Sequence, residues 1–383
     1  MVSAARRSRL IQATETVAAV LATAMLAAAC GGSSRPVAAT SATAPATAPA
    51  TAPAAAPAAA PAAAPAAAPA AAPAAAGTPS RTASGVPARA LSLGVADTYR
   101  VGEQRMTFTE PAHVGVTGQQ LGERSVLTVI RYPVGRGSSG SWPAGGPFPL
   151  IMFAPGFMQC SSTYEDLLRS WASAGYVVAS VDFPRTDCLV GSAAYEPDLV
   201  NQPGDVSYVL SRLLALSAQP LGFLSGRLNR HQIAAAGQSD GGDTVAALAG
   251  NTCCQDHRLR AVAVLSGAEW PAMPGAYFAG KAPAVLFVQG NADTINPPWT
   301  SVQLYRADRA SPRYYLNLYG ADHMVPYTGD NPVERLVARI TLAFFDRYVL
   351  GHAGALITMR QAADNSGGTA ALDSGGQLPP NTG

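Results

Sequence analysis

Lysine is almost absent from this chain of 383 residues: Lys281 is the only lysine among 26 basic residues. Charged residues make up 13% of the chain, and its formal net charge is +2. No run of basic residues stands out in the part of the chain that could fold. Domains that bind nucleic acid usually carry a strongly basic face or stripe, so we expect no nucleic-acid partner.

The spacing of metal ligands is also missing. The chain has five histidines and five cysteines, but they do not cluster with the spacing of zinc ligands. We expect no metal ion and no other cofactor.

The N-terminal apolar stretch is too short to cross a membrane as a helix. Residues 16–29 carry no charge, and basic residues precede them at Arg6, Arg7 and Arg9. A membrane span needs about 20 apolar residues. A basic start, a shorter apolar run and then small residues are typical of a secretory signal. We therefore predict that the chain is exported.

The run Leu26-Ala27-Ala28-Ala29-Cys30 resembles a bacterial lipoprotein box, in which the cysteine is lipidated and becomes the new N-terminus. The leucine stands four residues before the cysteine, where three is usual. The resemblance implies that residues 1–30 are a lipoprotein-type signal peptide. Cys30 would then anchor the chain to the cell membrane, facing the periplasm or the cell exterior. An ordinary signal cleaved nearby is the alternative.

Residues 31–90 have the composition of a tether. Alanine, proline, threonine and serine dominate them, and proline recurs at every fourth position at Pro45, Pro49, Pro53, Pro57, Pro61, Pro65, Pro69 and Pro73. Each proline removes a backbone donor and clashes with the preceding turn, so a helix is disfavoured despite the alanines. We predict a disordered, extended spacer of roughly 3 Å per residue. Recognition by a proline-binding partner and glycosylation of the threonines are alternative roles.

The remaining sequence divides into a domain and a tail. Residues 91–352 number about 260, a normal size for one α/β domain. Residues 353–383 are rich in glycine, serine and proline towards their end, and we predict a mostly disordered tail.

Strand-like and helix-like patterns alternate along residues 91–352. The expected strands are Arg105–Thr109, Ser125–Tyr132, Leu150–Ala154, Tyr176–Val181, Gln232–Ala236, Ala261–Leu265, Ala284–Gln289 and Tyr314–Leu318. The expected helices are Tyr164–Ala174, Val206–Ser217, Gly241–Ala249, Thr300–Asp308 and Val333–Tyr348. This order predicts an α/β fold with a mostly parallel central sheet of about eight strands and helices on both faces. Sites in such sheets form beyond the carboxyl ends of the strands.

One serine stands at the apex of a predicted strand-to-helix turn. The turn reads Gly237-Gln238-Ser239-Asp240-Gly241-Gly242, and glycine on either side allows a tight bend that exposes the serine hydroxyl. The chain has 37 glycines, so the G-x-S-x-G pattern alone is weak. The acid and the histidine that follow it strengthen the interpretation.

In this architecture the nucleophile is followed by the acid and then by the histidine. His323 and His352 lie beyond the plausible acids. His323 is favoured because it follows the last expected strand, whereas His352 ends the last expected helix. Asp293 follows an apolar strand and is the favoured acid. Asp322 is its rival, but it is adjacent to His323 and cannot readily turn its carboxylate onto that ring.

These residue types suit acyl transfer. A neutral imidazole takes the serine proton, and a carboxylate fixes the tautomer of the imidazole. Charge that develops on the carbonyl oxygen needs hydrogen-bond donors. We expect the backbone N–H groups of Asp240 and Phe157 to form this oxyanion hole, because Phe157 lies in the glycine-containing loop after the strand Leu150–Ala154. The Phe157 ring would also contact the substrate.

Residues from about 148 to 345 resemble the α/β-hydrolase superfamily, and among it the bacterial cutinase, polyester hydrolase and platelet-activating-factor acetylhydrolase-like enzymes. The runs that carry the resemblance are Phe153-Ala154-Pro155-Gly156-Phe157, Gly237-Gln238-Ser239-Asp240-Gly241-Gly242, Gly290-Asn291-Ala292-Asp293-Thr294 and Gly320-Ala321-Asp322-His323. The resemblance implies a catalytic triad of Ser239, Asp293 and His323.

Two further positions take their interpretation from this resemblance. Trp270 stands where such enzymes often carry an aromatic residue that stacks on the substrate, although a core tryptophan is nearly as common there. Asp240 is a departure, because an apolar residue commonly follows the nucleophile in the polyester-degrading members. An extra carboxylate beside the oxyanion hole could disfavour anionic substrates.

Four cysteines remain after Cys30. Cys160 and Cys188 each follow a predicted strand at the same end of the sheet, so they are the favoured disulfide pair in an exported domain. Cys253 and Cys254 would then form a vicinal bridge or remain free thiols.

The sequence therefore predicts a secreted, membrane-tethered serine hydrolase of esterase, lipase or cutinase-like type that cleaves carboxylic esters through an acyl-enzyme. Its expected partners are a small-molecule or polymeric ester substrate and the membrane that holds its lipid anchor, and a monomer is expected. Two alternatives stay open. One is a non-catalytic lipoprotein that uses the hydrolase fold to bind a ligand. The other is a serine hydrolase that acts on amides, peptides or thioesters.

Overall fold

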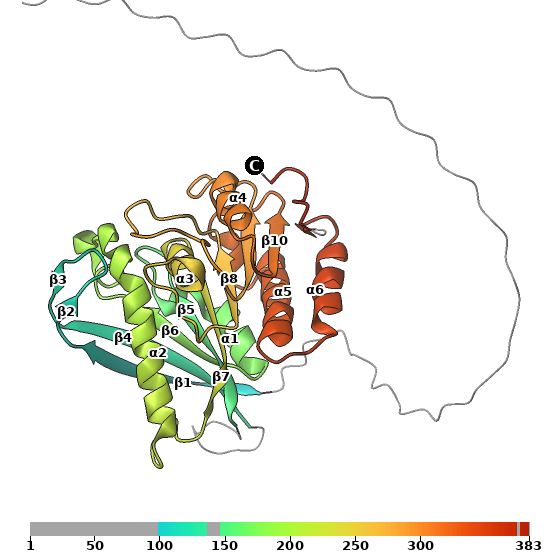
Figure 1. Ribbon diagram of the computed structural model, residues 1–383. Coiled ribbons are helices and arrows are strands. Elements are labelled where there is room, and N and C mark those ends of the chain that lie inside the picture. The colour runs from blue at the N-terminus through green and yellow to red at the C-terminus, as the bar shows by residue number, and fades with distance from the viewer. Residues whose placement is uncertain (1–98, 136–145, 374–375, 383) are drawn as a thin grey trace, which may run out of the picture. The chain divides into compact units, whose positions relative to one another are not determined.

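The computed structural model describes residues 99–135, 146–373 and 376–382 (Figure 1). The predicted signal peptide with Cys30, the predicted tether and the predicted start of the domain at residue 91 lie outside these ranges. None of the helices in the described ranges combines the length and the apolar character that a membrane crossing requires.

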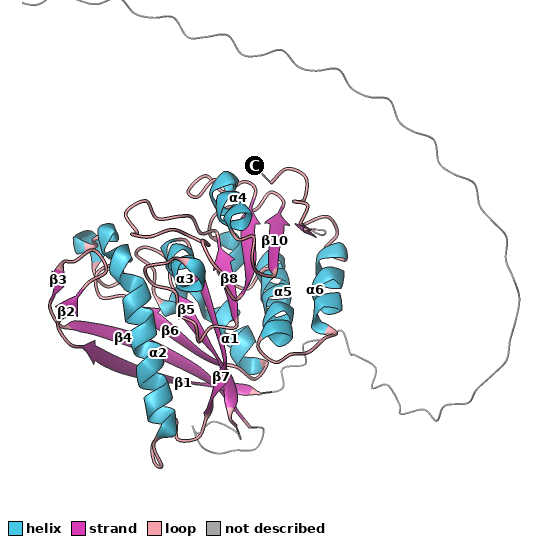
Figure 2. Cartoon of the chain, viewed as in Figure 1, coloured by secondary structure: helices cyan, strands magenta, loops and turns pink. Residues whose placement is uncertain are grey.

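A nine-stranded sheet forms the centre of the domain (Figure 2). Its strands, in spatial order, are β1 (Arg100–Glu110), β4 (Arg124–Val134), β6 (Val177–Asp182), β5 (Phe148–Ala154), β7 (Leu228–Gln238), β8 (Ala261–Leu265), β9 (Ala284–Gly290), β10 (Arg313–Leu318) and β11 (Ala370–Leu372). The strands from β6 to β10 run parallel to one another, whereas β1, β4 and β11 pair antiparallel with their neighbours. A separate small ribbon pairs β2 (His113–Val114) with β3 (Gln120–Leu121).

Six α-helices and four short 3₁₀ helices of the described residues surround the sheet. The α-helices are α1 (Glu165–Ser173), α2 (Gln202–Ala218), α3 (Asp240–Gly250), α4 (Pro298–Ala307), α5 (Pro332–Tyr348) and α6 (Ala355–Asp364). The 3₁₀ helices are η1 (Ser161–Tyr164), η2 (Gly191–Ala193), η3 (Glu196–Asn201) and η4 (Val325–Tyr327).

The two faces of the sheet bury separate apolar clusters. Leu150 and Met152 of β5 pack in the cluster that α2, α3 and α4 cover. Ile151 and Phe153 pack in the cluster that α1, α5 and α6 cover. Successive side chains of a strand point to opposite faces, so a strand buried on both sides must be apolar throughout. This explains the continuous apolar runs of the parallel strands.

The predicted α/β fold is confirmed, and each of the eight expected strands and five expected helices corresponds to an element of the structure. The number of strands in the sheet is nine rather than about eight. The additional strand is β11, which pairs antiparallel with the edge strand β10.

The prediction of a mostly disordered tail over residues 353–383 is wrong for residues 355–372. Helix α6 packs on the domain through Ala355, Met359, Ala362 and Ala363, which are all buried. Their spacing follows the period of an amphipathic helix. Alanine is only weakly hydrophobic, so these positions do not show a clear apolar pattern in the sequence. The glycine and serine residues that follow therefore made the segment 353–383 resemble a disordered tail. The domain therefore continues past residue 352.

A buried ionic cluster attaches η3 to the sheet. The Arg124 guanidinium at the start of β4 donates hydrogen bonds to both carboxylate oxygens of Asp198, with Nη2 to Oδ2 at 2.7 Å. It also donates to Asp205 of α2, with Nη2 to Oδ2 at 2.6 Å. Breaking a buried pair leaves an uncompensated charge, which costs about 3–5 kcal/mol. The cluster therefore fixes the segment around Glu196.

Helix α5 begins with a buried carboxyl group. Asn331 caps the helix, and its Oδ1 accepts hydrogen bonds from the N–H groups of Val333 and Glu334 at 3.0 Å each. The Glu334 side chain is 2% exposed, and among the described residues its Oε1 has no hydrogen-bond partner. Burial, together with the negative charges of Asp166 and Asp330, raises the pKa of Glu334 to about 7.

This carboxyl group should make the stability of the domain fall as pH rises from about 4.5 to about 7. Over that range the folded state holds a proton that the unfolded state has lost, so the free energy of unfolding decreases with pH. We expect Glu334→Gln to melt near the wild-type temperature at pH 5 and a few degrees above it at pH 8. Thermal unfolding followed by circular dichroism measures both. A difference between the two proteins that is the same at both pH values would contradict this assignment.

Candidate active site

Ser239 lies at a strained turn between β7 and α3. Its backbone has φ 56° and ψ −125°, in the region that favours glycine. A residue other than glycine keeps such a conformation only where its surroundings enforce it, and such residues cluster at functional sites. Here the Ser239 N–H donates to the carbonyl of Leu265 at 2.9 Å, and the Ser239 carbonyl accepts from the N–H of Asp243 at 3.0 Å.

Glycines allow this turn to close. A Cβ atom on Gly237 would overlap the carbonyl oxygen of Gly241, and a Cβ atom on Gly241 would overlap that of Ala154. A Cβ atom on Gly242 would lie 2.9 Å from Cα of Gly267. The start of α3 therefore touches the backbone of β5 and β8, and the serine hydroxyl is held at the end of the sheet.

The imidazole of His323 contacts the Ser239 hydroxyl. The distance from Nε2 of His323 to Oγ of Ser239 is 2.9 Å. His323 lies in the loop after β10, and its carbonyl accepts a hydrogen bond from Nε2 of Gln238 at 3.0 Å. The residue before Ser239 thus binds the loop that carries the histidine. The rival histidine, His352, is exposed near the end of α5.

Asp293 binds the other ring nitrogen of His323. Its Oδ2 lies 2.8 Å from Nδ1 of His323 and also accepts from Nε2 of Gln289 at 3.0 Å. Its Oδ1 accepts from the N–H groups of Ile295 and Asn296 at 2.9 and 3.0 Å. Burial disfavours ionisation of Asp293, but the hydrogen bond and charge of His323 and these two backbone donors outweigh it. The pKa of Asp293 is therefore below its ordinary value.

Asp322, the rival acid, caps its own loop instead. Its Oδ1 accepts hydrogen bonds from the N–H groups of Met324 and Val325 at 3.0 and 2.8 Å. This capping orders the turn that follows His323.

The loop after β5 lies against the serine turn. A Cβ atom on Gly156 would be 2.9 Å from Oε1 of Gln238 and 3.1 Å from Cβ of Ser239. The Gly156 N–H donates to the Tyr164 hydroxyl at 3.1 Å, which donates to Oε1 of Gln238 at 2.7 Å. Phe157 follows Gly156 directly, so its backbone lies beside Ser239. The N–H of Asp240 is the first of α3, where helices leave their N–H groups without an intrahelical partner.

The sequence placed the Asp240 carboxyl group beside the serine but did not indicate that it would be buried. It is 7% exposed, and within the described residues its Oδ2 has no hydrogen-bond partner. Burial, and after it the charge of Glu196, raise the pKa of this carboxyl to about 7, against the opposing effects of the His323 charge and of a hydrogen bond from its own backbone N–H. Asp243, one turn further along α3, is also buried. Its Oδ1 accepts from the N–H of Ala268 at 2.6 Å.

Trp270 lies in the loop after β8. It packs with a small apolar cluster that contains Leu199, Ala247 and Met273. Its backbone N–H donates to the Tyr277 hydroxyl at 3.3 Å.

Two disulfides join the remaining cysteines. Cys160 is bonded to Cys188, which links the loop after β5 to the loop after β6. The same two loops are joined by the N–H of Met158, which donates to the carbonyl of Thr186 at 2.7 Å. Cys253 is bonded to Cys254. Cys160 follows Phe157 by three residues, so the first disulfide restricts the movement of the loop that contains Phe157.

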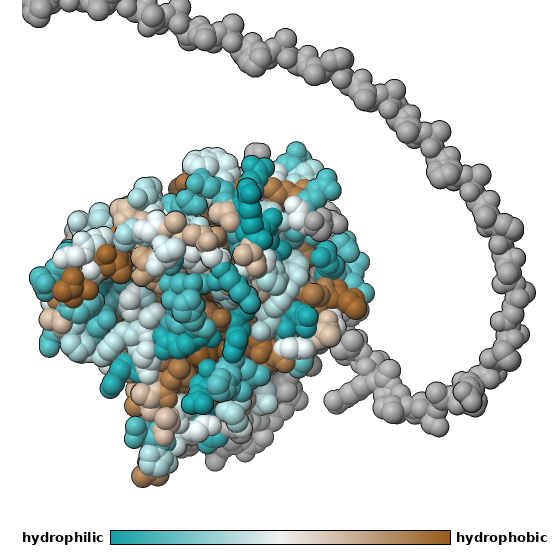
Figure 3. Space-filling view, viewed as in Figure 1, coloured by the Kyte–Doolittle hydropathy of each residue, from teal (hydrophilic) through white to brown (hydrophobic). Residues whose placement is uncertain are grey.

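Exposed apolar side chains follow the site residues along the chain. Met158, Ile295 and Val325 are 43%, 67% and 45% exposed. On the face shown in Figure 3 the hydrophobic groups lie in separate places, including the edge beside β2 and β3, and do not form one continuous patch.

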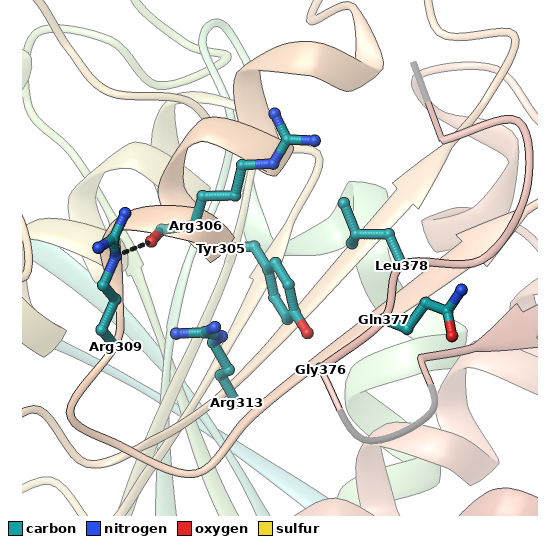
Figure 4. A pocket seen from close by; sticks show the side chains of 7 residues that line it. All are labelled: Tyr305, Arg306, Arg309, Arg313, Gly376, Gln377 and Leu378. Atoms are coloured by element: carbon teal, nitrogen blue, oxygen red, sulfur yellow. Dashed lines mark hydrogen bonds between the residues drawn. The ribbon is translucent and has the colours of Figure 1, made fainter. Parts of the chain in front are cut away.

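A pocket rich in arginine has none of the predicted site residues in its lining (Figure 4). It has a volume of about 560 Å³, and it is lined by Tyr305, Arg306, Arg309, Arg313, Gly376, Gln377 and Leu378. The three guanidinium groups point in different directions. Arg313 stacks over the Tyr305 ring at 4.8 Å, and Nε of Arg309 donates to the carbonyl of Arg306 at 3.4 Å. The arginines therefore support the turn between α4 and β10.

Within the described ranges no group of three or more histidine, cysteine or carboxylate side chains could hold a metal ion. A family model described as PET hydrolase-like matches residues 128–353. The match runs from within β4 to the residues after α5, and it includes Ser239, Asp293 and His323. No curated protein matches the chain.

The glycine requirement of the serine turn can be tested at Gly241. We expect Gly241→Ala to lower the free energy of unfolding by about 3 kcal/mol or more, because the new methyl group would meet a backbone oxygen that cannot rotate away. Chemical denaturation measures this.

Gly204 of α2 is a matched control, because a Cβ atom there meets nothing within 4 Å. We expect Gly204→Ala to cause no loss of stability. Equal effects of the two substitutions would show that the tight approach at the serine turn is not a constraint.

Proposed function

Because the chain belongs to the PET hydrolase-like family of α/β-hydrolases, we propose that it is a serine hydrolase that cleaves carboxylic esters through an acyl-enzyme. Family membership supports an ester hydrolase. The observation that carries the finer proposal is the continuous chain of hydrogen bonds from Asp293 through His323 to Ser239.

In the proposed first step, Oγ of Ser239 attacks the ester carbonyl carbon. The serine proton moves to Nε2 of His323 as the Oγ–C bond forms, and the carbonyl oxygen becomes an oxyanion. When the tetrahedral intermediate collapses, the bond from carbon to the alkoxy oxygen breaks. His323 returns the proton to that oxygen, and an alcohol leaves.

Water completes the cycle in the same way. His323 takes a proton from water, the hydroxyl oxygen bonds to the acyl carbon, and the bond from that carbon to Ser239 breaks. The proton returns to Oγ and a carboxylic acid leaves. Each half of the cycle uses the same imidazole first as a base and then as an acid.

Asp293 supports this exchange in two ways. Its Oδ2 accepts from Nδ1, which leaves Nε2 as the acceptor that faces Ser239. Its lowered pKa keeps it ionised at neutral pH, so its charge stabilises the imidazolium that forms during each step.

In this proposal the backbone N–H groups of Phe157 and Asp240 donate hydrogen bonds to the oxyanion. Both are adjacent to Ser239 through the packing of Gly156 and the start of α3. Removing one such donor from a serine hydrolase typically costs about 3–4 kcal/mol of transition-state stabilisation.

The role of Ser239 can be tested directly. We expect Ser239→Ala to lower the kcat for p-nitrophenyl butyrate by a factor of about 10⁶ and to abolish labelling by a fluorophosphonate probe. The exposed Ser192 provides a matched control, and Ser192→Ala should keep both activities. Turnover retained by Ser239→Ala would refute the proposed nucleophile. A folded wild-type protein that neither reacts with the probe nor hydrolyses esters would instead favour the ligand-binding alternative.

We further propose that the enzyme is exported and held at the membrane through a lipid on Cys30. The basic start, the short apolar stretch and the lipobox-like run support this. If residues 31–90 extend as polyproline-like chain, these roughly 60 residues reach up to about 180 Å. Such a reach would let the domain meet substrates away from the membrane surface.

Metabolic labelling with a radioactive fatty acid tests the anchor. We expect the wild-type chain to be labelled and to fractionate with membranes, whereas Cys30→Ala should carry no label. The variant Gly31→Ala, next to the modified position, should still be labelled. Equal labelling of the Cys30→Ala chain would rule out this cysteine as the lipid site.

A further inference from the structure

Asp240 places a carboxyl group directly after the nucleophile, and the mechanism above uses only its backbone. We propose that the Asp240 side chain makes substrate charge a determinant of specificity, so that the enzyme favours uncharged esters over esters whose acyl part carries a carboxylate. This inference rests on the proposed ester hydrolysis and names the class of substrate that the same site selects.

The position of Asp240 gives its charge access to the reacting atoms. It is the first residue of α3, between Ser239 and Gly241, and Gly241 is packed against the carbonyl groups of Ala154 and Pro155. The charge of Asp240 raises the pKa of Tyr164, and the charge of His323 opposes the rise in the pKa of Asp240, so the carboxyl group lies within electrostatic reach of both side chains. His323 contacts the Ser239 hydroxyl, and Tyr164 binds Gln238, the residue before Ser239. A charge on Asp240 therefore acts on whatever acyl group is bound at Ser239.

No cation of the described residues pairs with the carboxyl group, and the hydrogen bond that favours its charged form comes from its own backbone N–H. Its Oδ2 is buried and unpaired within the described part of the chain, and neither of its oxygens forms one of the ion pairs found there. A buried polar atom usually has a partner, so an unpaired carboxyl oxygen beside a nucleophile calls for an explanation other than stability.

The groups that face Asp240 come from several elements. Glu196 of η3 adds negative charge, and the Arg124 cluster fixes η3. Asp243 lies one turn further along α3, and Tyr164 of η1 contributes a buried phenol. His323 is the one group among them that gains positive charge.

Protonation of Asp240 then sets the strength of the selection. Burial raises its pKa to about 7, so the group is mostly neutral below that pH and mostly ionised above it. Ionisation would repel an oxyanion but would also favour an imidazolium, so its effect on an uncharged ester has two opposing parts. An ester with a remote carboxylate also experiences electrostatic repulsion between that carboxylate and the ionised Asp240. This contribution always disfavours binding.

The ratio of kcat/KM for two matched esters isolates the repulsion between Asp240 and the substrate carboxylate. The pair is 4-nitrophenyl hexanoate and mono-4-nitrophenyl adipate, which have the same chain length and differ in a terminal carboxylate that is ionised throughout pH 6–9. Protonation of His323 affects both esters and cancels in the ratio. We expect the ratio of the uncharged to the anionic ester to rise about tenfold across pH 7. This is the order expected for two unit charges about 10 Å apart at an effective dielectric constant of about 20.

Two variants test the assignment to Asp240. Asp240→Asn should give a ratio that stays flat with pH, near the value of the wild-type enzyme at pH 6. Glu196→Gln should move the rise in the ratio to lower pH, because it removes a charge that raises the pKa of Asp240. A merely structural role for Asp240 would produce neither change. Should Asp240→Asn fail to fold, the shift in Glu196→Gln still decides the question.

A ratio that does not change with pH in the wild-type enzyme would overturn the inference, and so would a rise that persists in Asp240→Asn. In both cases turnover of the hexanoate ester would show that the proposed ester hydrolysis itself stands. Absence of turnover of either ester at any pH would overturn both proposals, and the two failures are thus distinguishable.

Discussion

The whole site depends on how closely the start of α3 approaches the sheet. Gly237 and Gly241 have no room for a Cβ atom, because backbone carbonyl oxygens of the turn and of β5 occupy that space. This close contact forces Ser239 into a left-handed conformation and directs its hydroxyl beyond the strand ends. It also brings the first N–H groups of α3 next to the loop of Phe157. One steric constraint therefore positions both the proposed nucleophile and the N–H groups proposed to bind the oxyanion.

Polar side chains around the proposed triad hold Ser239, His323 and Asp293 in position. Gln238 binds the Tyr164 hydroxyl through its oxygen and the His323 carbonyl through its nitrogen. It therefore connects the serine turn, the loop after β5 and the histidine loop. Gln289 and two backbone N–H groups donate hydrogen bonds to the Asp293 carboxylate and fix its orientation. Rigid support of this kind matters because catalytic hydrogen bonds must form without reorganisation.

Much of this arrangement could be predicted from the sequence, because its signals are local. The parallel strands are apolar throughout, and Ser239, Asp293 and His323 each follow a strand in the order that the fold requires. The parts that could not be predicted from local patterns depend on contacts between distant residues. Nothing near Tyr164 in the sequence indicates that its hydroxyl would bind Gln238, and Trp270 could be placed only through the resemblance. Helix α6 was missed because its buried residues are mostly alanines, whose burial depends on the neighbouring α5.

The electrostatics of α3 set two effects against each other. The N-terminus of a helix carries a partial positive charge that favours an anion by up to about 2 kcal/mol in partly buried geometry. Burying a charge costs several kcal/mol per ion. For Asp240 burial outweighs the helix dipole, since its pKa rises to about 7 rather than falling. While the carboxyl is neutral, the positive end of α3 is free to stabilise the oxyanion of the substrate. Once the carboxyl ionises, the helix end already has a negative charge beside it. In the proposed mechanism, the residue that supplies an oxyanion donor through its backbone therefore also controls, through the charge of its side chain, how strongly the helix field acts on the substrate.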